Sequence, residues 1–294
     1  MWLLVGGDSE IGAATHQWLK GQGIASAATT RRKERVAADR PFLDLSLPLD
    51  DWEPPAGTTA ACIFAAIARI AVCDADPRGS AQVNVVQTVA LADRLLERGI
   101  SVLFLSTNQV FDGSVPHVAA DTPTCPVTEY GRQKARAEDA FRERMARGHP
   151  VAILRLAKVV SPDMPLVRGW IETLTAGRQI HAFDDMTMAP AQTETVSAAV
   201  AALMQARATG VYQLTGPRDL AYVEIGRHLA RRLGVDPALV VKSSTVDAGL
   251  PPGSARAHTT LDSSRLRDAH AIAAPDVTSI IDAVVEASGV ISRK

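Results

Sequence analysis

The sequence predicts an α/β fold, in which a doubly wound parallel sheet is followed by a smaller mixed C-terminal domain. Three features of the chain support this prediction. Apolar stretches of strand length alternate with helical stretches, a pattern typical of parallel sheets. The first strand runs directly into a glycine-rich turn and a helix. An apolar run at Val102–Leu105 ends in Ser106 and Thr107, where parallel strands open into a ligand crevice.

Composition narrows the class of protein. The 294 residues are 47% hydrophobic and 21% charged, an ordinary globular mixture that is long enough to bury a large core. The formal net charge of −1 gives no support for a surface that binds nucleic acid or membrane. No apolar run approaches the roughly 18 residues that a membrane-spanning helix needs. We therefore expect neither nucleic acid nor membrane among the partners.

The cysteines and histidines indicate the compartment and argue against a metal site. Cys62, Cys73 and Cys125 are odd in number and far apart, which fits a reducing compartment better than a disulfide framework. The first residues lead straight into a strand, without the basic region and cleavage site of a signal peptide. No C-x-x-C pair occurs and the seven histidines are scattered singly. We expect a cytoplasmic protein without a metal.

The N-terminal strand, turn and helix match a dinucleotide-binding unit of the Rossmann type. We expect a strand at Trp2–Val5, then a glycine-rich turn, then a helix that ends near Gly21. Gly6 permits the tight turn, and Gly12 lets helix and strand pack closely. Ser9 stands where a middle glycine would let the backbone approach a phosphate, although its hydroxyl can donate to one.

The start of this helix can hold a pyrophosphate. The helix is expected to begin at Ala13, after a turn at Gly6–Gly12 that includes Glu10 and Ile11, and the N–H groups and dipole at its start favour an anion. The alternative is a plain strand-to-helix turn without a ligand.

The second strand bears on the choice of cofactor. It is expected at Ile24–Thr29 and is followed by Thr30, Arg31 and Arg32. A site that prefers NAD usually places an acid here, roughly 20 residues past the glycine turn, to hold the ribose 2′-OH. This chain has none, and arginines can grip a 2′-phosphate bidentately. The pattern favours NADP over NAD, with a solvated basic loop as the alternative.

Later elements complete the expected cofactor site. Leu43–Leu45 is the expected end of a third strand, with Asp44 available to the adenine amino group. A fourth strand, Thr59–Ala65, ends in small residues that let a cofactor come close. Asn84 lies on a long helix at Ser80–Arg98, either as a surface residue or as a support of the site. The expected cofactor residues are Gly6, Ser9, Glu10, Ile11, Gly12, Thr30, Arg31, Arg32, Asp44, Leu45, Ala65, Ala66, Asn84 and Lys134.

Tyr130 and Lys134 open a helix that is expected to run to about Arg147. At the i and i+4 positions they share one face, and an ammonium beside a phenol should lower the pKa of the phenol. Tyr130 is then a candidate general acid or base, and Thr107 a candidate hydrogen-bond donor to a reacting carbonyl. The same spacing also describes an ordinary exposed helix pair.

The C-terminal portion is less regular. A boundary is expected at Ser161–Pro165, which divides the chain into a dinucleotide-binding domain at 1–160 and a substrate domain at 161–294. A helix and strand at about 185–215 are expected to return to the first domain. A further helix is expected at Tyr222–Leu233.

Across nearly its whole length the chain resembles an extended short-chain dehydrogenase/reductase, and most of all the dTDP-4-dehydrorhamnose reductase branch. The matching pieces are Val5–Gly7 with Gly12, Arg31–Arg32, Ala65–Ala66, Val83–Asn84, Ser106–Thr107 with Val110–Gly113, Tyr130–Gly131 with Lys134 and Glu138, Ile153–Arg155, Gly210–Gly216 and Tyr222–Ile225.

This resemblance implies roles for individual residues. Thr107, Tyr130 and Lys134 match the catalytic set of the family. Tyr130 would protonate the carbonyl oxygen as hydride arrives from NADPH, Lys134 would hold the nicotinamide ribose, and Thr107 would orient the carbonyl. The resemblance also implies a nucleotide-sugar substrate bound between the two domains, and it allows a homodimer.

Departures from the family pattern concentrate in the substrate half. Asn108 and Gln109 stand where the branch has an acid and an aromatic residue, and Lys158 follows an apolar pair after Arg155. Asn108, Gln109 and Lys158 are therefore the candidate substrate residues, with a solvated lysine as the alternative for Lys158. Candidate contacts to the substrate pyrophosphate are Arg168, Arg178 and Arg256, with surface charges as the alternative for each.

The leading hypothesis is an NADP-dependent reductase of a keto group on a nucleotide-activated sugar. One alternative is an NAD(P)-dependent sugar-nucleotide epimerase on the same scaffold. The other is a non-catalytic, NADP-binding regulatory subunit, which the altered substrate loop keeps open.

Overall fold

A six-stranded parallel sheet forms the larger part of the computed structural model, which describes residues 1–161, 164–250 and 255–290. The strand order is β10-β5-β4-β3-β1-β2, so β2 and β3 lie on opposite sides of β1 and the expected doubly wound sheet is confirmed. In chain order the strands are β1 (Trp2–Val5), β2 (Ser26–Ala28), β3 (Ala60–Ile63), β4 (Ser101–Thr107), β5 (Val151–Leu156) and β10 (Gly210–Leu214).

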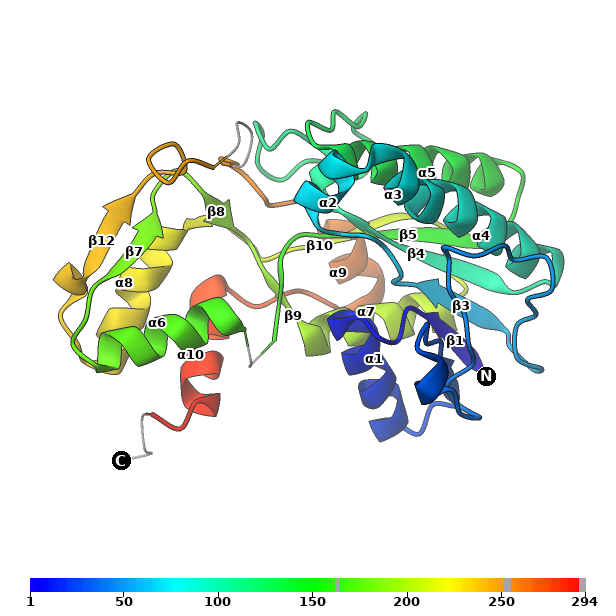
Figure 1. The fold of residues 1–294 in the computed structure, drawn as a ribbon, viewed down its shortest axis with the longest axis horizontal. Coiled ribbons are helices and arrows are strands. Elements are labelled where there is room, and N and C mark those ends of the chain that lie inside the picture. Colours follow the sequence, from blue (N-terminus) through cyan, green and yellow to red (C-terminus); the bar gives the residue numbers. More distant parts are fainter. Residues whose placement is uncertain (162–163, 251–254, 291–294) are drawn as a thin grey trace.

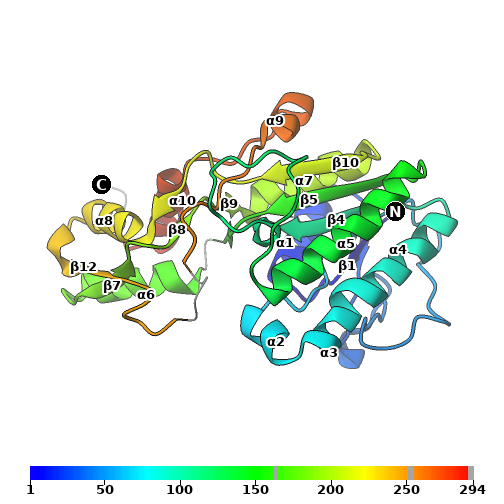
Figure 2. The same cartoon turned by 90° about the horizontal axis from the view of Figure 1, so that it is seen from above.

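Helices cover both faces of this sheet (Figures 1 and 2). On one face α1 (Glu10–Gly21) packs beside α7 (Thr193–Gln205), and α9 (Ser264–His270) lies next to β10. On the other face lie α4 (Thr88–Glu97) and α5 (Glu129–Ala146). Since both faces are covered, β1, β3, β4 and β5 are buried at every residue, which explains their continuous apolar runs.

The helix expected at Ser80–Arg98 begins earlier and is not uniform. It starts as α3 (Pro77–Ala81), with a proline at its first position and the Asp76 carboxylate as its cap. A π-helical stretch, η2 (Gln82–Gln87), then leads into α4. Asn84 lies in this wide turn and is buried, so its interpretation as a surface residue is wrong.

The prediction of a strand ending at Leu43–Leu45 is also wrong. In the described part of the chain, this segment joins the sheet only through an isolated bridge between Thr30 and Phe42. The Asp44 carboxylate accepts from the backbone N–H and the hydroxyl of Ser46, at 2.9 and 2.7 Å. Such a local side-chain turn competes with strand pairing.

The C-terminal part has a smaller core of its own (Figure 1). Its helices are α6 (Pro165–Thr175), α8 (Tyr222–Leu233) and α10 (Val277–Ala287). They pack around a parallel pair, β7 (Ile180–Phe183) with β12 (Val240–Ser243), and an antiparallel pair, β8 (Thr187–Met188) with β11 (Leu220–Ala221). The remaining elements are a short α-helix, α2 (Ile70–Ala75), and three 3₁₀ helices, η1 (Lys33–Arg35), η3 (Asn108–Val110) and η4 (Pro237–Leu239).

The chain passes between the two parts at a short parallel pair, β6 (Val159–Val160) with β9 (Ala191–Gln192). After β9, α7 and β10 return to the large sheet. The expected boundary at Ser161–Pro165 includes residues 162 and 163, which lie outside the described residues, so the division at 160 stays a prediction. No described helix is both long and apolar enough to cross a membrane.

Candidate active site

Two adjoining clefts open at the carboxyl ends of the strands of the large sheet. One cleft, of about 670 Å³, lies over the glycine turn and the end of β2, and we call it the dinucleotide cleft after the ligand that the sequence predicts. The catalytic cleft, of about 590 Å³, lies between the end of β4 and the C-terminal part. Ser9 and Ala66 line both clefts, so the two meet beside the glycine turn. Doubly wound sheets bind their ligands at this edge.

The glycine turn has the shape of a pyrophosphate cradle. Gly6 has a φ of +96°, and a Cβ there would lie 2.6 Å from the Ala65 nitrogen. A Cβ on Gly12 would lie 2.4 Å from the Gly6 carbonyl oxygen. Both positions therefore require glycine. Glu10 and Ile11 begin α1, so their N–H groups have no partner within the helix and are available to a phosphate.

Ser9 has a structural task inside this turn. Its hydroxyl accepts from the Gly12 N–H at 3.1 Å and donates to the Gly6 carbonyl at 2.7 Å. Ser9 is thus the cap of α1, and its proton is not directed at a phosphate, contrary to the expectation from sequence.

Glu10 links the two parts of the chain. Its carboxylate accepts from the Ser161 hydroxyl at 2.7 Å, which connects the first turn of α1 to the segment that enters the C-terminal part. The side chain that follows the cap of the dinucleotide helix thus also borders the catalytic cleft.

The far end of the dinucleotide cleft is basic. Arg31 and Arg32 line it and are exposed. Thr30 is buried, and its hydroxyl donates to the Asp8 carboxylate at 2.7 Å. Asp44 lines the cleft, but Ser46 already occupies one of its carboxylate oxygens.

Asn84 supports the loop after β3, which forms one wall of the dinucleotide cleft. Leu45, Ala65 and Ala66 line the dinucleotide cleft, whereas Asn84 lies behind it. The Asn84 side chain accepts from the Ile67 N–H at 2.7 Å and donates to the Ile67 carbonyl at 3.0 Å. It also donates to the Gln133 side chain on α5 at 2.7 Å. The Asn84 amide therefore links the loop around Ile67 to the helix that carries Tyr130 and Lys134.

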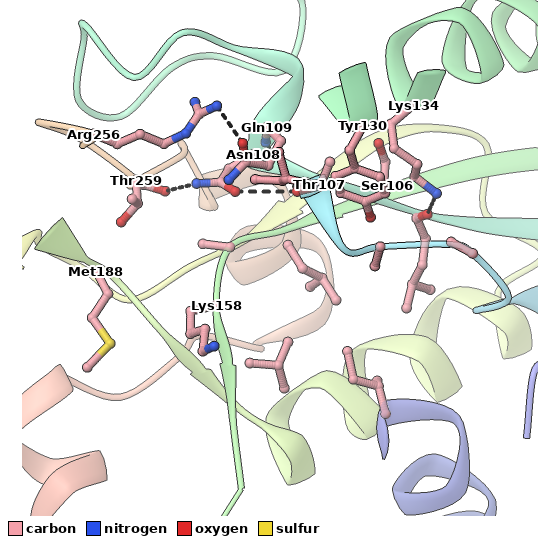
Figure 3. A pocket seen from close by; sticks show the side chains of 18 of the residues that line it. Ser106, Thr107, Asn108, Gln109, Tyr130, Lys134, Lys158, Met188, Arg256 and Thr259 are labelled. Carbon is pink, nitrogen blue, oxygen red and sulfur yellow. Dashed lines mark hydrogen bonds between the residues drawn. The ribbon is translucent and has the colours of Figure 1, made fainter. Parts of the chain in front are cut away.

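Thr107, Tyr130 and Lys134 all line the catalytic cleft (Figure 3). Thr107 ends β4, where its hydroxyl accepts from the Gln109 N–H at 3.2 Å. Tyr130 and Lys134 stand one turn apart at the start of α5. That start is set by Thr128, whose hydroxyl caps the helix. The structure therefore brings all three predicted side chains to one cleft.

Burial sets the pKa of both groups on α5. It raises the pKa of the Tyr130 phenol, to which no described residue hydrogen-bonds. It lowers the pKa of Lys134 to about 7, against the opposing effect of Glu138. The Lys134 ammonium donates to the Leu105 carbonyl at 2.5 Å and lies 3.8 Å from the centre of the Phe104 ring. The expectation that Lys134 lowers the pKa of Tyr130 is wrong, because burial dominates for both groups.

The candidate substrate residues also line the catalytic cleft. Asn108 donates to the Thr259 carbonyl at 3.5 Å, and Gln109 accepts from the Arg256 guanidinium (Figure 3). Arg256 also donates to the Phe111 carbonyl at 2.6 Å. The segment around 256–259 is thereby tied to the loop after β4, although the two are almost 150 residues apart. Lys158 lines the cleft and is exposed.

Of the three arginines that sequence suggested for the substrate pyrophosphate, Arg256 lines the catalytic cleft, whereas Arg168 and Arg178 are not among its lining residues.

Sequence reasoning missed a buried polar network behind the tip of β4. The Ser106 hydroxyl donates to Glu138 at 2.5 Å, and Arg155 binds the same carboxylate at 2.7 Å. Arg155 also donates to the Gln213 side chain on β10 at 3.0 Å. Two signals could have found it: an arginine within the apolar strand β5, and an acid one turn beyond Lys134 on the same helical face.

Other lining residues were also missed because they come from distant segments. From the C-terminal part, these are Met186, Thr187, Met188, Tyr222 and Thr259. No group of three or more metal-ligating side chains occurs among the described residues.

Fold and site together define an NAD(P)-dependent reductase of the extended short-chain dehydrogenase/reductase class. A glycine turn with the shape of a pyrophosphate cradle lines one cleft, and a Thr–Tyr–Lys set lines the adjoining one. More narrowly, the chain belongs to the family described as the RmlD substrate binding domain, which matches residues 1–289.

Two curated relatives are reductases by name. A probable low-salt glycan biosynthesis reductase, Agl14, of Haloferax volcanii is 28% identical over 193 residues, and the match covers 63% of each chain. A dTDP-4-keto-6-deoxy-D-glucose reductase of Streptomyces niveus is 27% identical over 241 residues, and that match covers 81% of each chain.

Solved structures share the fold over almost the whole chain. A dTDP-4-dehydrorhamnose reductase of Bacillus anthracis, in complex with NADP, has a TM-score of 0.78 and 15% identity, and the match covers 97% of each chain. MoeE5, in complex with UDP-glucose and NAD, has a TM-score of 0.81 and 20% identity, and covers 98% of each chain.

Proposed function

We propose that this chain is an NADP-dependent reductase of a keto group on a nucleotide-activated sugar. The observation that carries the proposal is the shared lining of the catalytic cleft by Thr107, Tyr130 and Lys134, next to a glycine cradle built for a dinucleotide. The Streptomyces niveus relative is by name a keto-sugar reductase, which supports the substrate class.

The chain supplies the proton and the positioning, while bound NADPH supplies the hydride. Because burial raises the pKa of Tyr130, its phenol keeps its proton at neutral pH and can donate it to the carbonyl oxygen. The Thr107 hydroxyl can hydrogen-bond to the same oxygen. Lys134 borders the same cleft and would hold the ribose next to the nicotinamide.

On the cofactor side, the N–H groups of Glu10 and Ile11 would hold the pyrophosphate, and Arg31 and Arg32 the 2′-phosphate. Both arginines line the cleft, and neither forms a side-chain ion pair within the described residues. This supports NADP as the cofactor.

On the substrate side, Arg256 and Lys158 would place positive charge on two walls of the catalytic cleft for the nucleotide diphosphate. Asn108 and Gln109 would present amides to the sugar, where related enzymes have other residues. A substrate that differs in its sugar from those of the named relatives is therefore expected.

The direct test is turnover. Purified protein is mixed with NADPH and a panel of 4-keto nucleotide sugars, and the absorbance of the reduced nicotinamide is followed. We expect loss of absorbance with at least one sugar. Tyr130→Phe should still bind NADPH but react at least about a hundredfold more slowly. Tyr212→Phe removes a phenol hydroxyl from β10, outside both clefts, and should keep its activity.

Other results would favour the alternatives. Wild-type protein that binds NADPH and turns over no keto sugar would be a non-catalytic NADP-binding subunit. An inverted sugar formed without net consumption of NADPH would indicate an epimerase.

We also propose a cytoplasmic location and a homodimer. Three free cysteines, of which Cys62 and Cys73 are buried, support a reducing compartment. Light scattering of the purified protein tests the dimer, and cell fractionation tests the location.

A further inference from the structure

Asp8 puts an acid at the ribose end of the dinucleotide cleft. It belongs to the glycine turn, but its carboxylate accepts from the Thr30 hydroxyl at 2.7 Å and from the Arg31 N–H at 3.2 Å. These two residues follow β2, the place from which an acid usually holds the ribose 2′-OH. The acid that the second strand lacks is therefore supplied from another loop.

This carboxylate is charged and lies at the surface of the dinucleotide cleft. Asp8 lines the dinucleotide cleft together with Arg31 and Arg32, and its side chain is 14% exposed. Burial alone would raise its pKa, but the hydrogen bonds from Thr30 and Arg31 and the charge of Arg40 lower it overall. An anion at this position would repel a 2′-phosphate and accept a hydrogen bond from a 2′-OH.

Arg40 forms the closer of two ion pairs with this anion from outside the cleft, and the exposed Arg35 lies 3.9 Å from the same carboxylate oxygen. The Arg40 guanidinium donates to Asp8 at 3.0 Å, and Arg40 does not belong to the residues that line the cleft. It lies at the end of a tight turn, where Ala37 and Arg40 exchange backbone hydrogen bonds of 3.1 and 2.9 Å. Arg31 and Arg32, in contrast, line the cleft, and the charge of Arg32 also acts on Asp8.

We propose that the Asp8–Arg40 pair sets the choice between NADPH and NADH. With Arg40 in place, Asp8 organises the loop at Thr30 and Arg31 without repelling the 2′-phosphate. Without Arg40, the same carboxylate favours the free ribose of NADH. Arg40 is then a positioning residue that acts through Asp8, and the inference rests on the proposed preference for NADP.

The test measures binding rather than turnover. Purified variants are titrated separately with NADPH and with NADH, and the fluorescence of the nicotinamide gives the two Kd values. Arg40→Ala should raise the ratio of the NADPH Kd to the NADH Kd by roughly threefold to tenfold. Asp8→Asn should lower this ratio. Arg40→Lys, which keeps the charge, should return the ratio toward that of the wild type.

Two further variants separate charge from general damage. Lys20→Ala removes the same charge from the neighbouring pair with Asp39, which does not line the cleft, and should leave the ratio unchanged. In the Asp8→Asn background, Arg40→Ala should change the ratio little. A loss of fold in Arg40→Ala would weaken the binding of NADPH and NADH equally. The Arg40→Lys and Asp8→Asn variants would then still test the pair.

An unchanged ratio in Arg40→Ala, alongside a large change in Arg31→Ala with Arg32→Ala, would overturn the inference and leave the proposed function standing. If the double variant at Arg31 and Arg32 weakens NADPH and NADH equally, the NADP preference itself fails.

Discussion

Glu138 and Arg155 form an ion pair at 2.7 Å in which neither side chain is exposed to solvent. The pair lies behind the tip of β4, where Ser106 donates to the same carboxylate next to Thr107. The end of β4, which carries Thr107, is therefore fixed by this buried network as well as by strand pairing within the sheet.

Glu138→Gln should strongly destabilise the protein, because it leaves the Arg155 charge buried without its counter-charge. We expect the free energy of unfolding, measured by urea titration, to fall by about 3 kcal/mol or more. The matched control is Glu53→Gln, which breaks the exposed pair with Arg98 and should cost less than about 1 kcal/mol. Equal losses in the two variants would contradict the importance of the buried pair.

Lys134 should make stability depend on pH in a definite direction. Its folded pKa is lowered to about 7, whereas an unfolded lysine titrates near about 10.4. Between these values the unfolded chain binds more protons, so the contribution of this group to the free energy of unfolding rises with pH. Urea titrations at several pH values within this window should show a steeper rise for wild type than for Lys134→Met. Parallel curves would count against a lowered pKa of Lys134.

Asn84→Ala should destabilise the loop around Ile67, which lines the dinucleotide cleft. The change removes the three hydrogen bonds that hold Ile67 and Gln133 and should lower the free energy of unfolding by about 2 kcal/mol. It should also weaken NADPH binding in a fluorescence titration, because the Ile67 loop lines the cleft. Gln82→Ala, at an exposed position of the same π-helical stretch, should change stability by at most about 0.5 kcal/mol. If Asn84→Ala matched Gln82→Ala in both the free energy of unfolding and NADPH binding, the Asn84 amide would not be needed to support the Ile67 loop.

Gly12→Ala should impair folding and cofactor binding, because its methyl group would meet the Gly6 carbonyl at 2.4 Å. The same substitution at Gly21, at the other end of α1, meets open space and should be neutral or slightly stabilising. Thermal melts with and without NADPH compare the two. If Gly12→Ala had the same melting temperature as Gly21→Ala, and the same increase on addition of NADPH, the close packing of the turn at Gly12 would be contradicted.

Most of the sheet could be predicted from sequence because its strands are buried on both faces and read as continuous apolar runs. Trp2–Val5 and the run that ends at Thr107 are examples. The segment around Asp44 could not, because its geometry depends on a side-chain turn with Ser46 rather than on a pattern of apolar residues.

The residues of the site were predictable where they follow local spacing, as with Tyr130 and Lys134. Their pKa values were not, because burial depends on what the rest of the chain packs against them. Asp8 was missed for a similar reason: its partners Thr30 and Arg40 are 22 and 32 residues away.

The bond between Arg256 and Gln109 spans 147 residues of sequence. During synthesis, the emerging polypeptide can complete the six strands of the large sheet once residue 214 is available. The catalytic cleft gains its last wall only when Arg256 and Thr259 have been added. A nascent chain would thus carry a finished sheet for some time before its catalytic cleft was complete.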